Sequence, residues 1–329
     1  MDQAVFMDKT VHDELWAITC YFNPAKYRNR RTNYQVFRQH LNVPLVTVEL
    51  AFDGHFELAK SNAEILIQIS GGDVMWQKER LLNIALEALP KSCEFVVSLD
   101  CDVIFQRTDW ALQVCRGLNE VPLLQPYSLV HHLPQGQPLE QWRTTRPSPM
   151  VRPSVAWLIA QGISVAECLG NPLAGVPGIR APGHAWAMRR DEILRHRFYD
   201  SCIIGGGDTA LACAAYGAFD ILPMLHTEND LAFQHYLRWA EPFHDSIQGR
   251  VSLVNGNLLH LWHGEMKDRL CRLRHRELAA YEFDPSEDIV LDENQCWRWN
   301  TPKRSMHEYV ADYFVARMED GVRSSTVAA

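Results

Sequence analysis

The fold of this chain is decided by the stretch Glu94-Phe95-Val96-Val97-Ser98-Leu99-Asp100-Cys101-Asp102-Val103-Ile104-Phe105. An apolar run ends at two aspartates that stand two positions apart, and in an extended strand such positions face the same side. We expect Asp100 and Asp102 to leave the end of a buried strand together, where an α/β sheet places its ligands. Buried carboxylates are costly unless they are paired or bind a metal, and Mg²⁺ and Mn²⁺ prefer oxygen ligands. The stretch therefore predicts either a divalent-metal site or a pair of solvated strand-end charges.

Strands and helices alternate in front of this stretch. The expected elements are strands over 15–22, 43–52 and 65–69, a helix over 26–41, and a helix marked by Leu81, Ala85 and Leu89. Asp73 is placed to cap that second helix. Such alternation over about 105 residues is typical of a largely parallel sheet covered by helices.

The pattern loosens after the aspartates. The expected elements are a helix over 107–120, a strand end at 123–126, a long Pro-, Gln- and Arg-rich loop over 131–153, a strand near 180–188, helices over 191–197 and 208–216, mixed helix and loop over 226–256, and a final helix over 305–318. No linker divides the chain, so we expect one domain over 1–320. Its parts would be a donor half (15–126), an acceptor half (127–259) and a C-terminal extension (260–320), followed by a frayed tail (321–329).

Composition limits the function. The 329 residues are 47% hydrophobic and 22% charged, with a net charge of −8. This balance argues against broad electrostatic binding to nucleic acid or anionic membrane. The sequence shows no long apolar run and no basic leader, and its nine cysteines include no Cys-x-x-Cys pair. We expect a cytoplasmic protein with reduced thiols and no membrane span.

A triple glycine precedes an acid in Gly205-Gly206-Gly207-Asp208. Glycines let a backbone pass close to a ligand, and the acid stands at the start of a helix. Asp208 is therefore either a catalytic acid or base, or a helix cap.

A histidine pair occurs in Leu258-Leu259-His260-Leu261-Trp262-His263-Gly264. The flanking residues favour a strand, on which positions three apart face opposite sides, so we expect only His263 to reach the site and His260 to be structural. Lys78 begins the helix that precedes the aspartates. A cation there is placed against the helix dipole, which favours contact with an anion such as phosphate over a solvated first turn.

In their order along the chain, these motifs resemble glycosyltransferases of the GT-A fold. The stretches His260–Gly264, Lys267–Arg269, Phe283–Pro285 and Tyr313–Gly321 also look like uncharacterised bacterial or phage glycosyltransferase-like proteins. The resemblance covers about residues 15–320. It implies a Rossmann-type, mixed but largely parallel sheet with helices on both faces, Mn²⁺ or Mg²⁺, and a nucleotide diphosphate sugar, above all a UDP-sugar, as donor. The acceptor would be a hydroxyl group of a glycan or small molecule.

The resemblance also assigns residues. Asp100, Asp102 and His263 would hold the metal, with Asp100 on the ribose or a metal-bound water. Asp208 would be the general base of an inverting transfer. The donor would contact Thr19, Tyr21, Asn23, Arg28, Glu49, Ala51, Phe52, Lys78 and Asp100, and the acceptor Trp186, Gly206 and Gly207. Some relatives carry a longer acidic run at the triple glycine, so the stereochemical outcome stays open.

Three other functions fit parts of the pattern. Arg143, Arg146 and Arg152 make a locally basic loop that would suit a glycosyltransferase acting on modified DNA bases. Paired aspartates on a sheet also occur in metal-dependent nucleotidyl transfer. The third alternative is a non-catalytic protein that binds nucleotide sugars.

Overall fold

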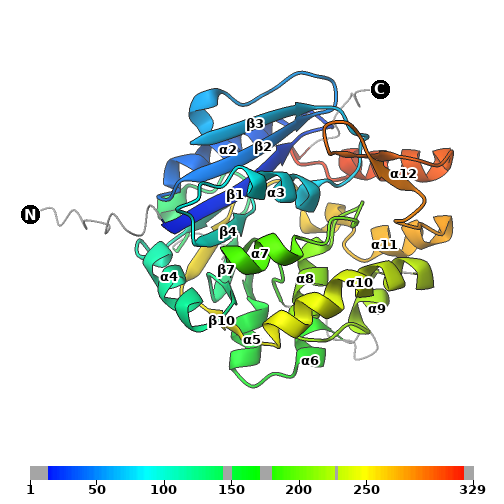
Figure 1. Ribbon diagram of the computed structural model, residues 1–329. Helices are drawn as coiled ribbons and strands as arrows, with labels where there is room; N and C mark the ends of the chain where they lie inside the picture. The colour runs from blue at the N-terminus through cyan, green and yellow to red at the C-terminus, as the bar shows by residue number, and fades with distance from the viewer. Residues whose placement is uncertain (1–13, 144–149, 171–179, 227–228, 322–329) are drawn as a thin grey trace, which may run out of the picture.

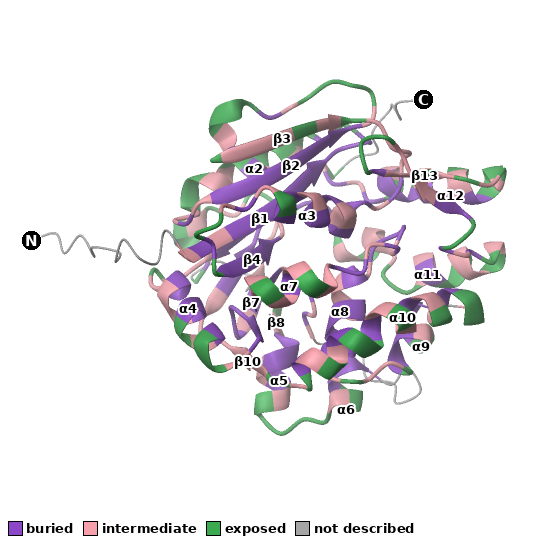
Figure 2. Cartoon of the chain, in the orientation of Figure 1, coloured by how far each residue is buried: buried purple, intermediate pink, exposed green. Residues whose placement is uncertain are grey.

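A seven-stranded sheet forms the centre of the molecule (Figure 1), in the order β10-β6-β9-β4-β1-β2-β3. The computed structural model describes residues 14–143, 150–170, 180–226 and 229–321. Strands β1 (Leu15–Phe22), β2 (Leu45–Ala51), β3 (Ile65–Ser70) and β4 (Phe95–Leu99) are parallel neighbours. Figure 2 shows β1, β2 and β4 as mostly buried, as expected for parallel strands covered on both faces.

Helices cover both faces of this parallel half. Phe37 of α2 (Arg28–His40) packs in one apolar cluster with Leu45. Leu81 of α3 (Lys78–Glu87) packs in another with Val46, the next residue along β2. Successive strand residues face opposite sides, so the two helices lie on opposite faces.

The other half of the sheet is mixed. Strand β9 (Ala185–Arg189) runs antiparallel between β4 and β6 (Leu123–Gln125), and β10 (Val251–Leu253) is parallel to β6. The predicted α/β class with a largely parallel sheet is therefore confirmed. The division into donor half, acceptor half and extension stays a prediction.

A second sheet follows the order β5-β11-β7-β8. Its strands are β5 (Val103–Phe105), β7 (Leu129–His132), β8 (Met150–Pro153) and β11 (Asn257–His260). The predicted loop over 131–153 is wrong at both ends, because β7 and β8 pair there; residues 144–149 lie outside the described residues. Pro153 does not prevent this pairing since β8 is an edge strand.

The remaining helices pack around the two sheets. They are α4 (Trp110–Glu120), α5 (Val155–Ala160), α6 (Val165–Leu169), α7 (Arg190–His196), α8 (Gly207–Ala215), α9 (Ile221–His226), α10 (Asp230–Ile247), α11 (Leu273–Leu278) and α12 (Arg304–Ala316), with a hairpin of β12 (Ile289–Leu291) and β13 (Trp297–Trp299) between the last two. No helix among the described residues is both long and apolar enough to cross a membrane.

Two local expectations need correction. Asp73 does not cap α3, which begins after Gln77; its carboxylate instead accepts the backbone N–H of Trp299. The region predicted as mixed helix and loop does hold a helix, α10, capped by the side chain of Asn229, but it also holds strand β10, which the prediction missed. Both depend on contacts or caps that a local apolar pattern does not show.

Candidate active site

A large cleft opens beside the carboxyl ends of β1 and β4. It holds about 2140 Å³ of empty space, counted to its open mouth. The predicted site residues that line it are Thr19, Lys78, Asp100, Asp102, Gly206, Asp208 and His263. The structure thus brings together residues from five separate segments of the chain.

Three potential metal ligands meet on one side of this cleft. The Nε2 atom of His263 lies 3.2 Å from Oδ2 of Asp102, and Nε2 of His260 lies 3.6 Å from Oδ1. The two Nε2 atoms are 3.2 Å apart. Among the described residues, this trio is the one group whose carboxylate and imidazole atoms gather closely enough for a metal.

Burial shapes the charges of this trio. It raises the pKa of Asp102, against the influence of His263, and it lowers the pKa of both histidines. The Oδ1 atom of Asp102 is buried and has no hydrogen-bond partner within the described residues. An orphaned carboxylate oxygen beside two neutral imidazoles fits a divalent first-row metal, which takes both O and N ligands.

The expectation that only His263 reaches the site is wrong. His260 is the last residue of β11, and the backbone N–H of Leu261 donates to the carbonyl of Asp102 at 2.9 Å. Strand β11 therefore ends before His263, and the backbone between the two histidines is not regular strand. The alternation that would separate them no longer applies, so both rings face Asp102.

Two further histidines lie behind the trio, and the sequence reasoning missed both. Nδ1 of His132 is 3.2 Å from Nδ1 of His260, its register partner on the neighbouring strand β7. Burial lowers the pKa of His132 to about 2. His184 places Nδ1 3.5 Å from Oδ2 of Asp100. Both contacts join segments that lie far apart in the sequence, so no local pattern predicts them.

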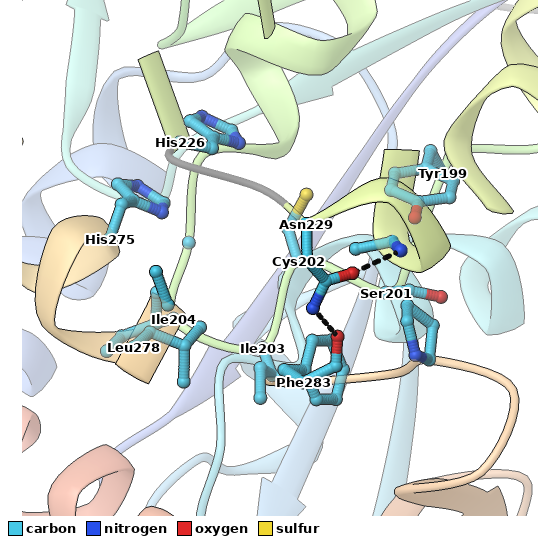
Figure 3. A pocket seen from close by; sticks show the side chains of 14 residues that line it. Tyr199, Ser201, Cys202, Ile203, Ile204, His226, Asn229, His275, Leu278 and Phe283 are labelled. Carbon is cyan, nitrogen blue, oxygen red and sulfur yellow. Dashed lines mark hydrogen bonds between the residues drawn. The ribbon is translucent and has the colours of Figure 1, made fainter. Parts of the chain in front are cut away.

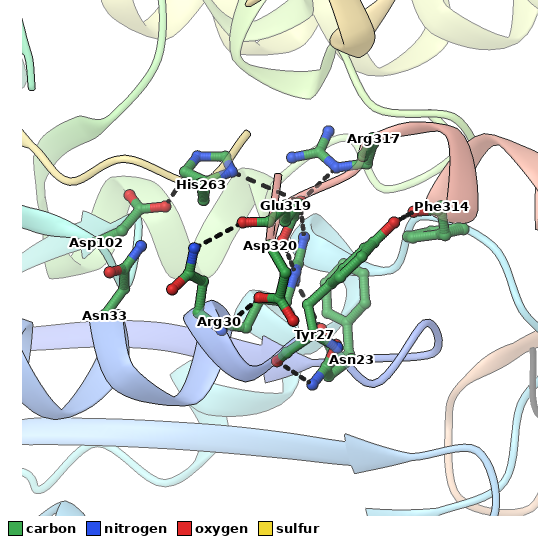
Figure 4. Close-up of polar contacts among 12 residues, drawn as sticks. Asn23, Tyr27, Arg30, Asn33, Asp102, His263, Phe314, Arg317, Glu319 and Asp320 are labelled. Atoms are coloured by element: carbon green, nitrogen blue, oxygen red, sulfur yellow. Dashed lines mark hydrogen bonds and ion pairs between the residues drawn. The ribbon is translucent and has the colours of Figure 1, made fainter. Parts of the chain in front are cut away.

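Glu319 supports the trio from the C-terminal end (Figure 4). Its carboxylate lies 3.5 Å from Nδ1 of His263 and accepts hydrogen bonds from Arg30 and Arg317 at 2.6 and 2.5 Å. Burial would raise its pKa, but the two guanidinium groups hold the pKa well below its usual value. A carboxylate on the second ring nitrogen orients a histidine ligand and increases its basicity. Glu319 lies in Tyr313–Gly321, one of the stretches that carry the family resemblance. Its contact with His263 was not predictable, because it depends on the position of the segment after α12.

A lysine joins two carboxylates on the other side of the cleft. Nζ of Lys78 lies 2.7 Å from Oδ1 of Asp100 and 2.8 Å from Oδ2 of Asp208. Burial would lower the pKa of Lys78, but both acids raise it well above its usual value. Burial would also raise the pKa of Asp100, but the charge of Lys78 lowers it below its usual value. For Asp208 the effect of burial is the larger one, and its pKa is raised. Lys78 thus meets carboxylates here, where the sequence predicted a phosphate.

Asp208 is not a helix cap. Helix α8 begins with Gly206 as its N-cap, at φ +105°, without a side-chain cap. The carboxylate of Asp208, in the first turn, points to Lys78 and to Gly183, where an added Cβ would lie 2.7 Å from Oδ2. The capping alternative for Asp208 is therefore excluded.

Glu79 is a buried acid that the sequence did not single out. An added Cβ at Gly207 would lie 2.2 Å from its Oε1 atom, so the first turn of α8 rests directly on this side chain. Burial raises the pKa of Glu79 to about 8, opposed by Lys78 and assisted by Asp208. The sequence could have indicated Glu79 as a site residue through its position directly after Lys78 in the first turn of α3.

Several predicted donor residues lie in a separate, smaller recess. It holds about 270 Å³ of empty space and is lined by Tyr21, Asn23, Glu49, Ala51, Phe52 and Glu57, among others. Arg28 is exposed, with Nε 3.9 Å from Asp320. Their donor roles stay predictions.

Trp186 is buried in the core, where its indole N–H donates to the carbonyl of Pro182. It does not itself line the cleft; Pro182 and Gly183 do. Its predicted acceptor contact stays a prediction.

A second cavity adjoins the cleft (Figure 3) and holds about 490 Å³ of empty space. The two share His226 and His275, whose rings stack with centroids 4.1 Å apart and planes 3° from parallel. Ile203, Ile204 and Phe283 contribute to its apolar lining. The stacked imidazoles therefore form a wall between a charged cleft and an apolar cavity.

No protein-family model and no curated protein matches the chain. Among solved structures, it is similar to S. aureus TarS 1-349 in complex with UDP-GlcNAc (10% identity, TM-score 0.38, covering 92% of this chain and 72% of that one). It is also similar to the mannosyltransferase PcManGT from Pyrobaculum calidifontis in complex with GDP-Man and Mn²⁺ (14%, 0.39, 81% and 63%). A third is a 4-diphosphocytidyl-2C-methyl-D-erythritol synthase from Anaerococcus prevotii (11%, 0.35, 76% and 90%). These likenesses are too distant to carry an argument about function.

Proposed function

We propose that this protein is a metal-dependent glycosyltransferase that moves a sugar from a nucleotide diphosphate sugar, above all a UDP-sugar, to a hydroxyl acceptor. The observation that carries the proposal is the meeting of Asp102, His260 and His263 in a cleft beside the carboxyl ends of parallel strands. Sheets of this class bind ligands at that edge. The motif resemblance described above supports the same reaction.

The donor would bind on the metal side of the cleft. Asp102, His260 and His263 would hold Mn²⁺ or Mg²⁺, which when bound supplies a charge that stabilises the leaving diphosphate. Arg269 lies beside this trio, with Nη2 2.9 Å from Nε2 of His263. Arg269 lines the cleft, and its Nε atom is buried without a hydrogen-bond partner among the described residues, so it would contact the diphosphate.

The acceptor would bind on the Asp208 side. Asp208 would take the proton of the acceptor hydroxyl as that oxygen attacks the anomeric carbon, which gives an inverting transfer. Lys78 holds the Asp208 carboxylate in place and shares its charge with Asp100. Gly206 brings the backbone at the start of α8 to the cleft without a side chain, and an acceptor contact of Gly207 would be through the backbone that follows it.

Product analysis with Asp208→Asn tests this proposal. With Mn²⁺ and a panel of nucleotide sugars, the wild-type chain should release nucleoside diphosphate. Asp208→Asn should lower this rate by about 10²-fold or more, while Mn²⁺ and UDP affinities stay unchanged. Asp220→Asn, an exposed acid, is the matched control.

Two results would contradict the proposal. Release of pyrophosphate would indicate nucleotidyl transfer. Full activity of Asp208→Asn would remove the assigned base and the inverting mechanism.

A further inference from the structure

Three arginines line the acceptor side of the cleft without acidic partners. They are Arg152 on β8, Arg180 shortly before β9, and Arg272 at the start of α11. None of the three has a carboxylate within ion-pair distance among the residues that the structure describes, although Arg30, Arg317 and Lys78 in the same cleft all do. The positive charge of these three side chains is therefore not balanced by ion pairs within the described residues.

Arg180 is the most constrained of the three. Its Nε atom is buried and has no hydrogen-bond partner within the described part of the chain. Burial lowers its pKa, and the charges of Arg272 and Arg152 lower it further, so both of these cations act on Arg180. A half-buried guanidinium with a buried, unpartnered Nε is costly, and an anion would reduce that cost.

The backbone holds this cluster in place. The N–H of Ala181 donates to the carbonyl of Pro153 at 2.8 Å, and Ser154 and Ala181 form a parallel bridge. These contacts tie the segment of Arg180 to the segment of Arg152. Gly170 has φ +90°, and an added Cβ there would lie 2.5 Å from Nη1 of Arg180. The space for the guanidinium thus depends on a glycine.

The segment that carries Arg180 continues to the proposed base. Gly183, three residues after Arg180, contacts Asp208 so closely that an added Cβ would lie 2.7 Å from Oδ2. Because Arg152, Arg180 and Arg272 line the same cleft as Asp208, we assign an anion bound by them to the acceptor side. The metal trio with Arg269 lies on the donor side.

We propose that Arg152, Arg180 and Arg272 bind a phosphate group of the acceptor, so that the acceptor is a phosphate ester that carries the reacting hydroxyl. The planar guanidinium fork matches phosphate oxygens in pairs, which a single lysine cannot do. A net charge of −8 disfavours nucleic acid as the source of that phosphate. The proposal rests on the proposed function for its acceptor role, whereas the anion site itself does not.

Calorimetric titration of the full chain with inorganic phosphate tests the site. The protein is first saturated with Mn²⁺ and UDP, so that the donor side is filled. Wild type should then bind one further phosphate, and Arg180→Gln and Arg272→Gln should each weaken that binding by at least about tenfold. The affinity for UDP should stay within about twofold. Arg276→Gln, an exposed arginine on α11 outside the cleft, is the matched control.

Arg272 is exposed, so we expect Arg272→Gln to fold normally. It therefore tests the site even if Arg180→Gln affects folding. A parallel titration with dimethyl phosphate separates the two ester types: tighter binding of inorganic phosphate indicates a phosphomonoester, and equal binding a phosphodiester. If Mn²⁺ and UDP do not bind, the proposed function is contradicted. Phosphate titration of the free chain then still measures whether the three arginines bind an anion.

Three results would overturn the proposal. The first is that wild type saturated with UDP binds no phosphate. The arginine variants could lose UDP and phosphate affinity equally, which would assign them to the donor diphosphate. Duplex DNA could bind more tightly than phosphate and depend on the same arginines, which would make the acceptor a nucleic acid.

Discussion

Two groups of polar residues lie on the parallel half of the main sheet, and they differ in how fully their hydrogen-bonding groups are satisfied. In the recess beside β1 and β2, the carboxylate of Glu49 accepts hydrogen bonds from the backbone N–H groups of Glu57 and Leu58 and from Gln68. In the cleft after β4, Oδ1 of Asp102 has no partner among the described residues. The recess satisfies its polar groups locally, whereas the cleft leaves capacity for a ligand.

This difference separates structural from functional polar residues better than strand-end position does. Tyr21 and Asn23 both donate to Glu57, so together with Glu49 they hold the loop that follows β2. The residues of the cleft come from distant segments and are linked mainly through charge. Unsatisfied groups that converge from several elements are the stronger indication of a site.

The largest effect in this comparison concerns the two histidines. His260→Ala and His263→Ala should each weaken Mn²⁺ binding by at least about tenfold, because both rings face Asp102. Competitive titration against a metal-sensitive dye measures this, with the exposed His55→Ala as control. If only His263→Ala has an effect, the sequence-based choice of a single histidine is restored.

Glu79 provides a test of burial beneath the cleft. Its folded pKa of about 8 lies above the ordinary 4.5, so between these values the folded chain retains a proton that the unfolded chain releases. The contribution of Glu79 to the free energy of unfolding is therefore highest below about pH 4.5 and falls as the pH rises towards 8.

Glu79→Gln removes this dependence. The melting temperature of the variant relative to wild type should be higher at pH 8 than at pH 5, and Glu120→Gln, an exposed acid, should show no such trend. An equal difference at both pH values would contradict the buried, protonated state of Glu79.

The smallest expected effect tests the recess. Tyr21→Phe removes the hydroxyl that donates to Glu57 at 2.7 Å, and should lower the free energy of unfolding by about 1 kcal/mol. UDP affinity should stay unchanged if the recess is structural. A tenfold loss of UDP affinity would instead place the nucleoside there, as the motif resemblance implied for Tyr21, and would break the contrast between the two regions.

The sequence predicted those parts that depend on local pattern. Continuous apolar runs identified β1, β2 and β4, and the residues after them placed Asp100 and Asp102 at the cleft. The start of α3 and the triple glycine likewise placed Lys78 and Asp208 there. Each of these signals lies within a few residues of the group that it positions.

The parts of the site that the sequence did not predict depend on contacts between distant segments. His132 meets His260 only through the register of β7 and β11, and Glu319 reaches His263 only because the segment after α12 docks beside it. Asp73 failed as a cap since its partner, Trp299, lies far along the chain. Long-range pairing of this kind leaves no periodic trace in one sequence.

The central claim is that Asp102 binds a divalent metal together with His260 and His263, and Asp102→Asn tests it most directly. Titration with Mn²⁺, followed by the electron paramagnetic resonance signal of the free aqueous ion, counts bound metal without any assay of activity. We expect one Mn²⁺ per wild-type chain, and a loss of affinity of about 10²-fold or more in Asp102→Asn at an unchanged melting temperature, since a charged ligand is removed. Asp220→Asn should bind Mn²⁺ like wild type. Equal Mn²⁺ affinity in wild type and Asp102→Asn would contradict the metal site and with it the proposed mechanism.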